Sequence, residues 1–348
     1  MRQLIGYFFA ALFVAPSARA DKIVLVAGGD MAKLESPFGV AFDKGSHCYV
    51  VEMTANRIGR LDADDYRILV GTGRKGDRGD GGAAAQAELN GPHHFLVGPD
   101  GSVFIADTWN NRVRKFDPKT GVITPFAGAG ETGFAGDGGP AAGAKFGGVY
   151  CLALDNHGER MVVADLDNRR IRAIDLKTGT VSTVAGNGQK GIPADGAEAT
   201  KAPLLDPRAV AVDDKGNLYI LERAGNVLRI VDAAGKIRTV VGTGEKGFSG
   251  DGGDALKAKL NGPKHLCIDR DGGVLIADTE NHVIRKYSPE TGQIVRVAGT
   301  GKKGSAGVGG PADTCELNQP HGVYLHPSGD IYISDSSNNR ILRIERGK

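Results

Sequence analysis

The chain has 348 residues, of which 24% are charged and 41% hydrophobic, and its formal net charge is +2. This balance excludes the strongly basic surface that nucleic-acid-binding proteins carry, and we expect no nucleic-acid partner. A zinc knuckle or thioredoxin-type site is not indicated either, because no C-x-x-C spacing joins the four cysteines, Cys48, Cys151, Cys267 and Cys315. We expect most of these cysteines to be buried free thiols.

Residues 1–20 predict a secretory signal peptide. Arg2 precedes an apolar run from Leu4 to Val14, and Ala18 and Ala20 form an A-x-A cleavage site. The run is shorter than the roughly 17–25 residues of a spanning helix, and no later segment comes close to that length. We therefore expect an exported protein, periplasmic or secreted, without a membrane span.

Six similar segments follow, with starts 55 to 58 residues apart. They cover residues 37–62, 92–117, 149–175, 207–232, 263–288 and 320–345. Each segment predicts a short apolar strand, a turn with Asp and Gly, a second strand that ends in Asp or Glu, a further turn and a third strand. A fourth strand such as "VSTVAGNG" or "IVRVAGTG" comes next. Four antiparallel strands repeated in this way predict the blades of a β-propeller.

The sixth segment ends at Lys348 without a fourth strand, whereas the region after the signal peptide opens with an unpaired strand, "DKIVLVAGG". We expect residues 22–28 to complete the last blade, which leaves no long unpaired edge. The predicted fold is all-β, a six-bladed propeller of four-stranded antiparallel blades, and residues 21–348 form one domain.

The pattern "GVAVD…GNLYIAD…NNRIRKFD" with a trailing "AGTG" resembles the NHL repeat over nearly the whole chain after residue 20. The linkers "GETGFAGDGGPAAGAKF" and "GEKGFSGDGGDALKAKLNGP" resemble those of bacterial secreted NHL-repeat proteins. The resemblance implies a propeller, a fold that serves binding modules and enzymes alike.

Two groups of acids invite structural rather than functional interpretations. The linker acids Asp80, Asp137, Asp195 and Asp251, replaced by Val308 in the fifth linker, are expected to cap short helical turns, since one acid per loop cannot bind calcium. The acids that end the second strands are expected to pair with arginines five positions later in three blades, as Asp107–Arg112, Asp165–Arg170 and Asp335–Arg340. Trp109 lies in one of these turns, where it either stacks on a sugar or plugs a linker.

The position after the opening proline of each repeat, or its equivalent, is expected to ring the central channel on the face that carries the long linkers. It holds Phe38, His93, Tyr150, Arg208, Lys264 and His321. The next position holds Gly39, His94, Cys151, Ala209, His265 and Gly322. Half of the eight histidines fall in these two columns. They are either ligands or only polar residues where a strand begins, and the sequence leaves both interpretations open.

The openings "GPHHF" and "QPHGV" resemble those of the peptidyl-hydroxyglycine amidating lyase, a six-bladed propeller whose zinc is held by histidines at such openings. The resemblance implies that His93 and His321 bind a divalent metal such as zinc. Blade four has Arg208 where a third histidine is expected, and catalytic zinc normally takes three protein ligands. His94 or His265 can replace the missing third ligand only if the twist of the strand turns its side chain toward the metal.

The first column combines positive charge with a phenol and has no carboxylate, which favours a small anionic ligand, a glycan or a protein partner at the channel mouth. The expected ligand-binding residues are His93, His94, Tyr150, Arg208, Lys264, His265, His321 and Trp109. The alternative is a metal-assisted lyase or hydrolase at the same mouth. In that case His93 and His321 hold the metal, and Tyr150 and Arg208 are catalytic.

Overall fold

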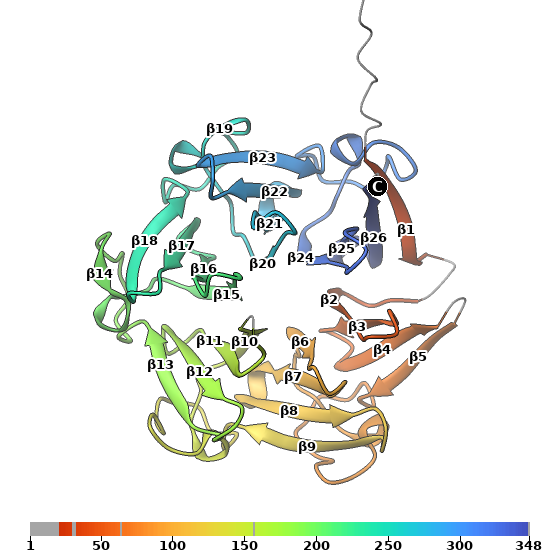
Figure 1. Ribbon diagram of the computed structural model, residues 1–348. Coiled ribbons are helices and arrows are strands. Elements are labelled where there is room, and N and C mark those ends of the chain that lie inside the picture. Colours follow the sequence, from red (N-terminus) through yellow and green to blue (C-terminus); the bar gives the residue numbers. More distant parts are fainter. Residues whose placement is uncertain (1–20, 30–32, 63–64, 156, 347–348) are drawn as a thin grey trace, which may run out of the picture.

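The computed structural model describes residues 21–29, 33–62, 65–155 and 157–346. Within these residues the strands form six small antiparallel sheets arranged radially around a central channel (Figure 1). This arrangement confirms the predicted six-bladed β-propeller. The expected signal peptide, residues 1–20, lies outside the described residues.

In blades one to three the strands run in chain order from the channel outward. Blade one has β2 (Pro37–Phe42), β3 (Cys48–Glu52), β4 (Arg57–Asp62) and β5 (Asp65–Val70). Blade two has β6 (His94–Val97), β7 (Val103–Asp107), β8 (Arg112–Asp117) and β9 (Val122–Ala127). Blade three has β10 (Val149–Leu154), β11 (Arg160–Asp165), β12 (Arg170–Asp175) and β13 (Val181–Ala185).

The other three blades repeat this order with additions at their outer edges. Blade four has β15 (Pro207–Val212), β16 (Leu218–Glu222), β17 (Val227–Val231) and β18 (Lys236–Val241), joined by β14 (Ala197–Glu198). Blade five has β20 (His265–Ile268), β21 (Val274–Asp278), β22 (Val283–Ser288) and β23 (Gln293–Ala298), joined by β19 (Gly253–Asp254). Blade six has β24 (Pro320–Leu325), β25 (Ile331–Asp335), β26 (Arg340–Glu345) and β1 (Lys22–Gly28).

Blades four and five therefore have five strands instead of the four that the repeat predicts. The fifth is a two-residue segment of the linker that pairs with the outer strand, as Ala197 with Ile237 and Gly253 with Ile294. At the same place in the other three linkers a single bridge forms, Ala83 with Val122, Pro140 with Thr180 and Pro311 with Lys22. The addition is thus a small extension of a contact that these linkers share.

The helices of the described residues are single 3-10 turns, none of which is long or apolar enough to cross a membrane. They are η1 (Ala84–Gln86), η2 (Thr108–Asn110), η3 (Ala141–Gly143), η4 (Ala199–Lys201), η5 (Ala255–Lys257), η6 (Thr279–Asn281), η7 (Ala312–Thr314) and η8 (Ser336–Asn338). Five of them lie in the linkers, and η2, η6 and η8 form the turns between second and third strands.

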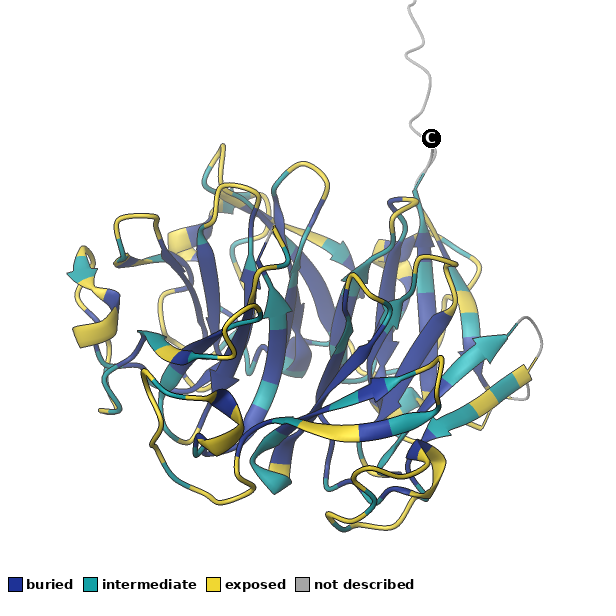
Figure 2. Ribbon diagram, turned by 60° about the horizontal axis from the view of Figure 1, so that its bottom comes forward, coloured by how far each residue is buried: buried dark blue, intermediate teal, exposed yellow. Residues whose placement is uncertain are grey.

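The core lies between the faces of neighbouring blades, which Figure 2 shows as buried strands beneath exposed loops. The middle residue of each second strand is fully buried: Val50, Ile105, Val163, Ile220, Ile276 and Ile333. These β-branched side chains suit a pleated surface that is covered on both faces. Each blade therefore buries its apolar residues against its two neighbours, as the closed ring requires.

The acids that end the second strands are fully buried, and two of the three predicted pairs with arginine form, of which Arg112–Asp107 is the longer at 3.5 Å. Arg340 pairs with Asp335 at 2.7 Å as expected, but Arg170 donates to the carbonyls of Asn168 and Asn187 instead of pairing with Asp165. The arginine nearest to Asp165 is Arg172, seven positions later, at 3.8 Å. Arg114 and Arg285 occupy the same position in blades two and five and are fully buried. Because side chains alternate between the two faces of a strand, these arginines point into the blade. The prediction from a five-residue spacing did not identify them.

Three of the four linker acids hold buried arginines, the fourth, Asp195, accepts the backbone N–H of Thr239, and none of the four caps a helical turn. Distances of 2.6–2.7 Å join three such pairs, Arg114–Asp80, Arg172–Asp137 and Arg285–Asp251. In blade six, where Val308 replaces the acid, the matching residue of the third strand is Leu342 in place of arginine. In blade four the corresponding arginine, Arg229, pairs with the strand acid Glu222 instead of the linker acid. Each of these buried guanidinium groups thus has an acid beside it, because a buried charge needs a counter-charge.

Side chains at the turns between second and third strands connect successive blades. The last turn residue has a left-handed backbone in all six blades, with φ between 48° and 56°, at Asn56, Asn111, Arg169, Asn226, His282 and Asn339. Asparagine tolerates this conformation better than most residues. Its side-chain oxygen accepts a backbone N–H of the next blade, as Asn111 does from Gly148 at 2.9 Å. Arg169 has no acceptor atom, so the junction of blades three and four lacks this connection.

The N-terminal strand closes the ring as predicted. β1 pairs antiparallel with β26, from Lys22 opposite Glu345 to Gly28 opposite Arg340 (Figure 1). The side chain of Ile23 is completely buried in the cluster that contains Ile333 and Ile344. The side chain of Leu25, in the same strand, is 37% exposed.

This closure predicts unequal effects of two truncations within β1. Ile23→Ala lowers the free energy of unfolding by about 2–5 kcal/mol, because it removes a fully buried side chain and leaves a cavity. Leu25→Ala changes the same quantity by roughly 0.5 kcal/mol or less, since surface substitutions have small effects. Equilibrium unfolding in guanidinium chloride measures both. Equal effects of the two substitutions would contradict the closure.

Candidate functional site

Six side chains meet across the channel on the face of the long linkers, and we call them the mouth ring. They are Phe38, His93, Tyr150, Arg208, Lys264 and His321, one from the start of the first strand of each blade. Five of the six neighbouring pairs are in direct contact, as His93 and Tyr150 with ring centroids 4.7 Å apart. The structure therefore brings this whole predicted column together.

Phe38 separates the two histidines for which a shared metal was expected. Its ring stacks on His321 at 4.0 Å and meets the edge of His93 at 5.3 Å. Each histidine turns Nδ1 to a carbonyl at the start of its own strand, that of Gly91 at 2.7 Å and that of Gln319 at 3.0 Å. The free Nε2 of His321 lies 3.2 Å from the Lys264 ammonium nitrogen. The mouth ring thus has no arrangement in which His93 and His321 share an ion.

Arg208 is the cation of the mouth ring that forms no ion pair with any acid in the part of the chain that the structure describes. It is 5% exposed, its guanidinium lies 4.5 Å from the centre of the Tyr150 ring, and its Nε is buried without a hydrogen-bond partner among the described residues. Burial lowers the pKa of Arg208 to about 10, which keeps it a cation at neutral pH. The other buried arginines pair with acids: Arg114, Arg172, Arg229, Arg285 and Arg340.

The cations beside Arg208 are already neutralised. Lys264 pairs with Glu280 at 2.9 Å, and Arg223 pairs with Asp206 at 2.8 Å. Burial, and next the charge of Arg208, holds the pKa of His93 well below its usual value. Burial and the neighbouring Lys264 do the same to the pKa of His321. At neutral pH both histidines are uncharged, and the unpaired charge at the mouth is that of Arg208.

Trp109 extends the mouth ring outward on η2. It is 48% exposed, and its ring centre lies 5.4 Å from that of His93. Gly91 makes room for the indole, because a Cβ at this position would lie 2.3 Å from a ring atom. One side of the indole is therefore fixed against the chain while a large part of its surface stays accessible, which suits stacking on a ligand.

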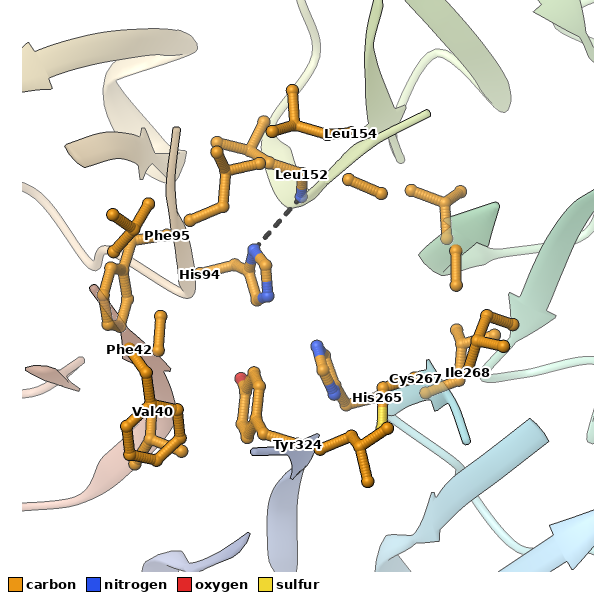
Figure 3. Close-up of a pocket in the computed structure, with 18 of the residues that line it drawn as sticks. Val40, Phe42, His94, Phe95, Leu152, Leu154, His265, Cys267, Ile268 and Tyr324 are labelled. Carbon is orange, nitrogen blue, oxygen red and sulfur yellow. Dashed lines mark hydrogen bonds between the residues drawn. The ribbon is translucent and has the colours of Figure 1, made fainter. Parts of the chain in front are cut away.

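A second group of side chains lies one position deeper in the channel, and we call it the inner cluster: His94, Cys151, His265 and Tyr324. His94 and His265 come from opposite blades, point toward one another and stack with centroids 5.0 Å apart (Figure 3). His94 accepts the backbone N–H of Leu152 on Nδ1 at 3.2 Å, and His265 Nδ1 lies 3.1 Å from the carbonyl oxygen of Val323. Each histidine thus forms a hydrogen bond with a backbone group in the innermost strand of the next blade.

The inner cluster closes one end of an apolar cavity of about 450 Å³. Its walls are the first strands of the blades, and besides His94, His265 and Tyr324 they expose mainly aliphatic side chains (Figure 3). It extends toward the face with the short turns, away from the mouth ring. Burial lowers the pKa of His265 to about 3 and raises the pKa of the Cys151 thiol to about 11. The inner cluster is therefore uncharged at neutral pH.

Sequence reasoning placed His94 and His265 correctly in one column but did not predict that they meet, because they stand 171 positions apart in blades two and five. It also did not single out Glu280 and Tyr324. Glu280 sits in the turn η6 and Tyr324 in the middle of a strand, so neither falls in an aligned column of polar residues.

Comparisons with known families agree with the repeat pattern. The model of the teneurin NHL domain matches residues 82–248, and the NHL repeat matches residues 260–287 and 317–344. The chain is an NHL-repeat β-propeller. The matched segments run from blade two to blade six and include five of the six mouth-ring positions.

Curated relatives are distant and much longer. The propeller is 25% identical to SUPPRESSOR OF QUENCHING 1 of Arabidopsis thaliana over 80% of this chain and 27% of the plant protein. It is 23% identical to NHL repeat-containing protein 2 of Gallus gallus over 88% of this chain and 46% of that protein. For teneurin-3 of Danio rerio the identity is 27%, over 76% of this chain and 10% of the relative. This chain thus spans less than half the length of each relative.

Solved structures share the fold of this NHL-repeat propeller. A Bacteroides thetaiotaomicron protein of unknown function and an auxiliary nutrient binding protein of Bacteroides ovatus each align with a TM-score of 0.69 and 15% sequence identity. The alignments cover 94% and 95% of this chain, and 76% and 78% of the two structures. At this identity the likeness shows the fold alone.

The missing counter-charge predicts that Arg208 destabilises the ligand-free protein. Arg208→Met raises the free energy of unfolding by about 1–3 kcal/mol, because methionine fills similar space and needs no counter-charge. Arg229→Met, in the same blade, lowers it by about 3–5 kcal/mol, since the substitution leaves buried Glu222 without its partner. Chemical unfolding in a buffer free of organic anions measures both. A loss of stability in Arg208→Met would show that Arg208 is a structural residue.

Proposed function

We propose that this propeller is an exported binding protein whose mouth ring takes a small ligand with a carboxylate and hydroxyl groups, such as a uronate or the acidic end of a glycan. The observation that carries the proposal is the buried guanidinium of Arg208, which forms no salt bridge with an acid among the described residues and whose Nε has no hydrogen-bond partner there. Guanidinium binds a carboxylate through two parallel charge-assisted hydrogen bonds. A bound carboxylate would supply the missing counter-charge.

The rest of the mouth ring suits the hydroxyl groups of such a ligand. His93 is neutral, and its Nδ1 donates to the Gly91 carbonyl, so its Nε2 can accept a hydrogen bond. Glu280 offers carboxylate oxygens beside Lys264. The accessible indole of Trp109 can stack on the apolar face of a sugar ring. These donors and acceptors distinguish a hydroxy acid from a bare inorganic anion.

Two further observations support a binding role. Structural neighbours of the same fold are described as auxiliary nutrient binding proteins. The sequence of residues 1–20 has the pattern of a signal peptide, in keeping with a protein that meets such ligands outside the cytoplasm. We do not extend the proposal to catalysis, because Phe38 separates the histidines that the metal-assisted alternative requires.

Isothermal titration with D-glucuronate tests this proposal. We expect the wild-type protein to bind glucuronate and to bind neutral D-glucose much more weakly. Arg208→Gln should weaken glucuronate binding by at least about 10-fold, the value of a charge-assisted hydrogen bond of roughly 1.5–3 kcal/mol.

Arg223→Gln is the matched control for this titration. Arg223 lies in the same blade beside the mouth ring, but Asp206 already neutralises it. We expect this variant to lose much less affinity for glucuronate than Arg208→Gln, because Arg223 acts on the ligand only through the local charge. If the wild type and Arg208→Gln bind glucuronate equally well, and also bind galacturonate equally well, the proposed role of Arg208 is refuted.

A further inference from the structure

The inner cluster brings together three side chains that commonly bind metals. One ligand atom each of His94, Cys151 and His265 lies within 4.8 Å of the other two, and all three residues are buried. They come from three different blades, so the closure of the ring creates the group. Neither the mouth ring nor the proposed carboxylate site uses these residues.

The types of atom favour a soft or borderline ion. Thiolate and imidazole bind copper and zinc, whereas calcium and magnesium prefer oxygen ligands. Carboxylates are absent from the residues that line the adjoining cavity. Ligand atoms at about 2.0 Å for nitrogen and about 2.3 Å for sulfur lie roughly 3.5 Å from one another around an ion. To reach this spacing from separations of up to 4.8 Å, the three side chains have to move toward one another.

The charge of the surroundings selects between copper and zinc. A thiolate with two neutral imidazoles carries one negative charge, so a monovalent ion gives a neutral complex. A divalent ion would leave one positive charge in a cavity of mainly aliphatic side chains, within the field of the unpaired Arg208. Zinc with three protein ligands also keeps a water molecule in its fourth position, and that water would lie among the mainly aliphatic side chains of the cavity.

We propose that His94, Cys151 and His265 form a binding site for one cuprous ion at the inner end of the apolar cavity. Binding is an exchange: the Cys151 S–H proton leaves to solvent as the sulfur–copper bond forms, and no electron is transferred. The cavity, which opens toward the short-turn face, gives the ion a path that does not cross the mouth ring.

The hydrogen bonds of the two histidines decide which ring nitrogen of each is free to bind an ion. His265 Nδ1 lies 3.1 Å from the Val323 carbonyl oxygen and 3.4 Å from the Val323 amide nitrogen, and in the tautomer that donates to the carbonyl a lone pair remains on Nε2. His94 accepts from Leu152 on Nδ1, so its Nε2 holds the proton until that bond is given up. Cys151 and His265 are therefore the ligands that need least rearrangement, and His94 completes the site.

Anaerobic titration with Cu⁺ in competition with bicinchoninate tests the proposal on the full chain. We expect one ion per chain, held by one sulfur and two nitrogen neighbours in the X-ray absorption spectrum. Cys151→Ser should weaken binding at least about 100-fold, because the loss of a direct ligand costs no less than the 10- to 100-fold loss seen for outer partners.

Cys267→Ser is the matched control, since Cys267 lines the cavity but does not belong to the group whose ligand atoms lie within 4.8 Å of one another. This variant should keep wild-type affinity for Cu⁺. The melting temperature of each metal-free variant and its glucuronate binding show whether the channel is intact. Unchanged Cu⁺ affinity in Cys151→Ser would overturn the proposal, and so would stoichiometric Zn²⁺ binding without Cu⁺ binding. Neither result affects the proposal for the mouth ring. That proposal is tested separately, by the glucuronate binding of Arg208→Gln.

Discussion

The buried carboxylate at the end of each second strand fixes the geometry of this propeller. The six acids are Glu52, Asp107, Asp165, Glu222, Asp278 and Asp335, all with no exposed surface. Each accepts a backbone N–H just before the first strand of its own blade, as Asp107 does from Asn90 and Glu222 does from Leu205. The residue that donates this N–H stands three positions before the mouth-ring residue in every blade. The acids thus determine where the mouth ring lies.

The remaining polar contacts extend this constraint from one blade to the ring. Buried arginines join three of the acids to the long linkers, and left-handed turn residues join one blade to the next. Charged groups in these positions are costly unless they are fully paired. The pairing is complete for the arginines that hold the linkers and missing for Arg208. A local rule that is broken at one site, in an otherwise consistent set, is expected where function resides.

Much of the fold was predictable because the same local sequence pattern occurs six times. The strand period, the turn residues and the unpaired strand at residues 22–28 each indicated the architecture independently. The partners of Asp165 and Asp137 were not predictable, since Arg172 is chosen by strand alternation and by the path of a linker from the preceding blade. Likewise, the aligned columns indicated which residues face the channel, but not that Phe38 lies between His93 and His321.

The same limit applies to the two levels of the channel. Alignment of the repeats grouped His94 with His265, yet only closure of the ring shows that opposite blades stack them together. The likeness to NHL-repeat proteins accounts for the scaffold, whereas the chemistry of each level depends on individual residues such as Arg208 and Cys151. Function in this propeller is therefore a property of single positions on a common frame.

A crystal structure of the protein soaked in sodium bromide would test the central claim most directly, because bromide is located by its anomalous scattering. We predict an anomalous peak in contact with the Arg208 guanidinium, and no such peak in Arg208→Gln crystals. A guanidinium that is satisfied by backbone carbonyls, with no anion beside it, would contradict the claim that Arg208 is an unpaired charge awaiting a ligand.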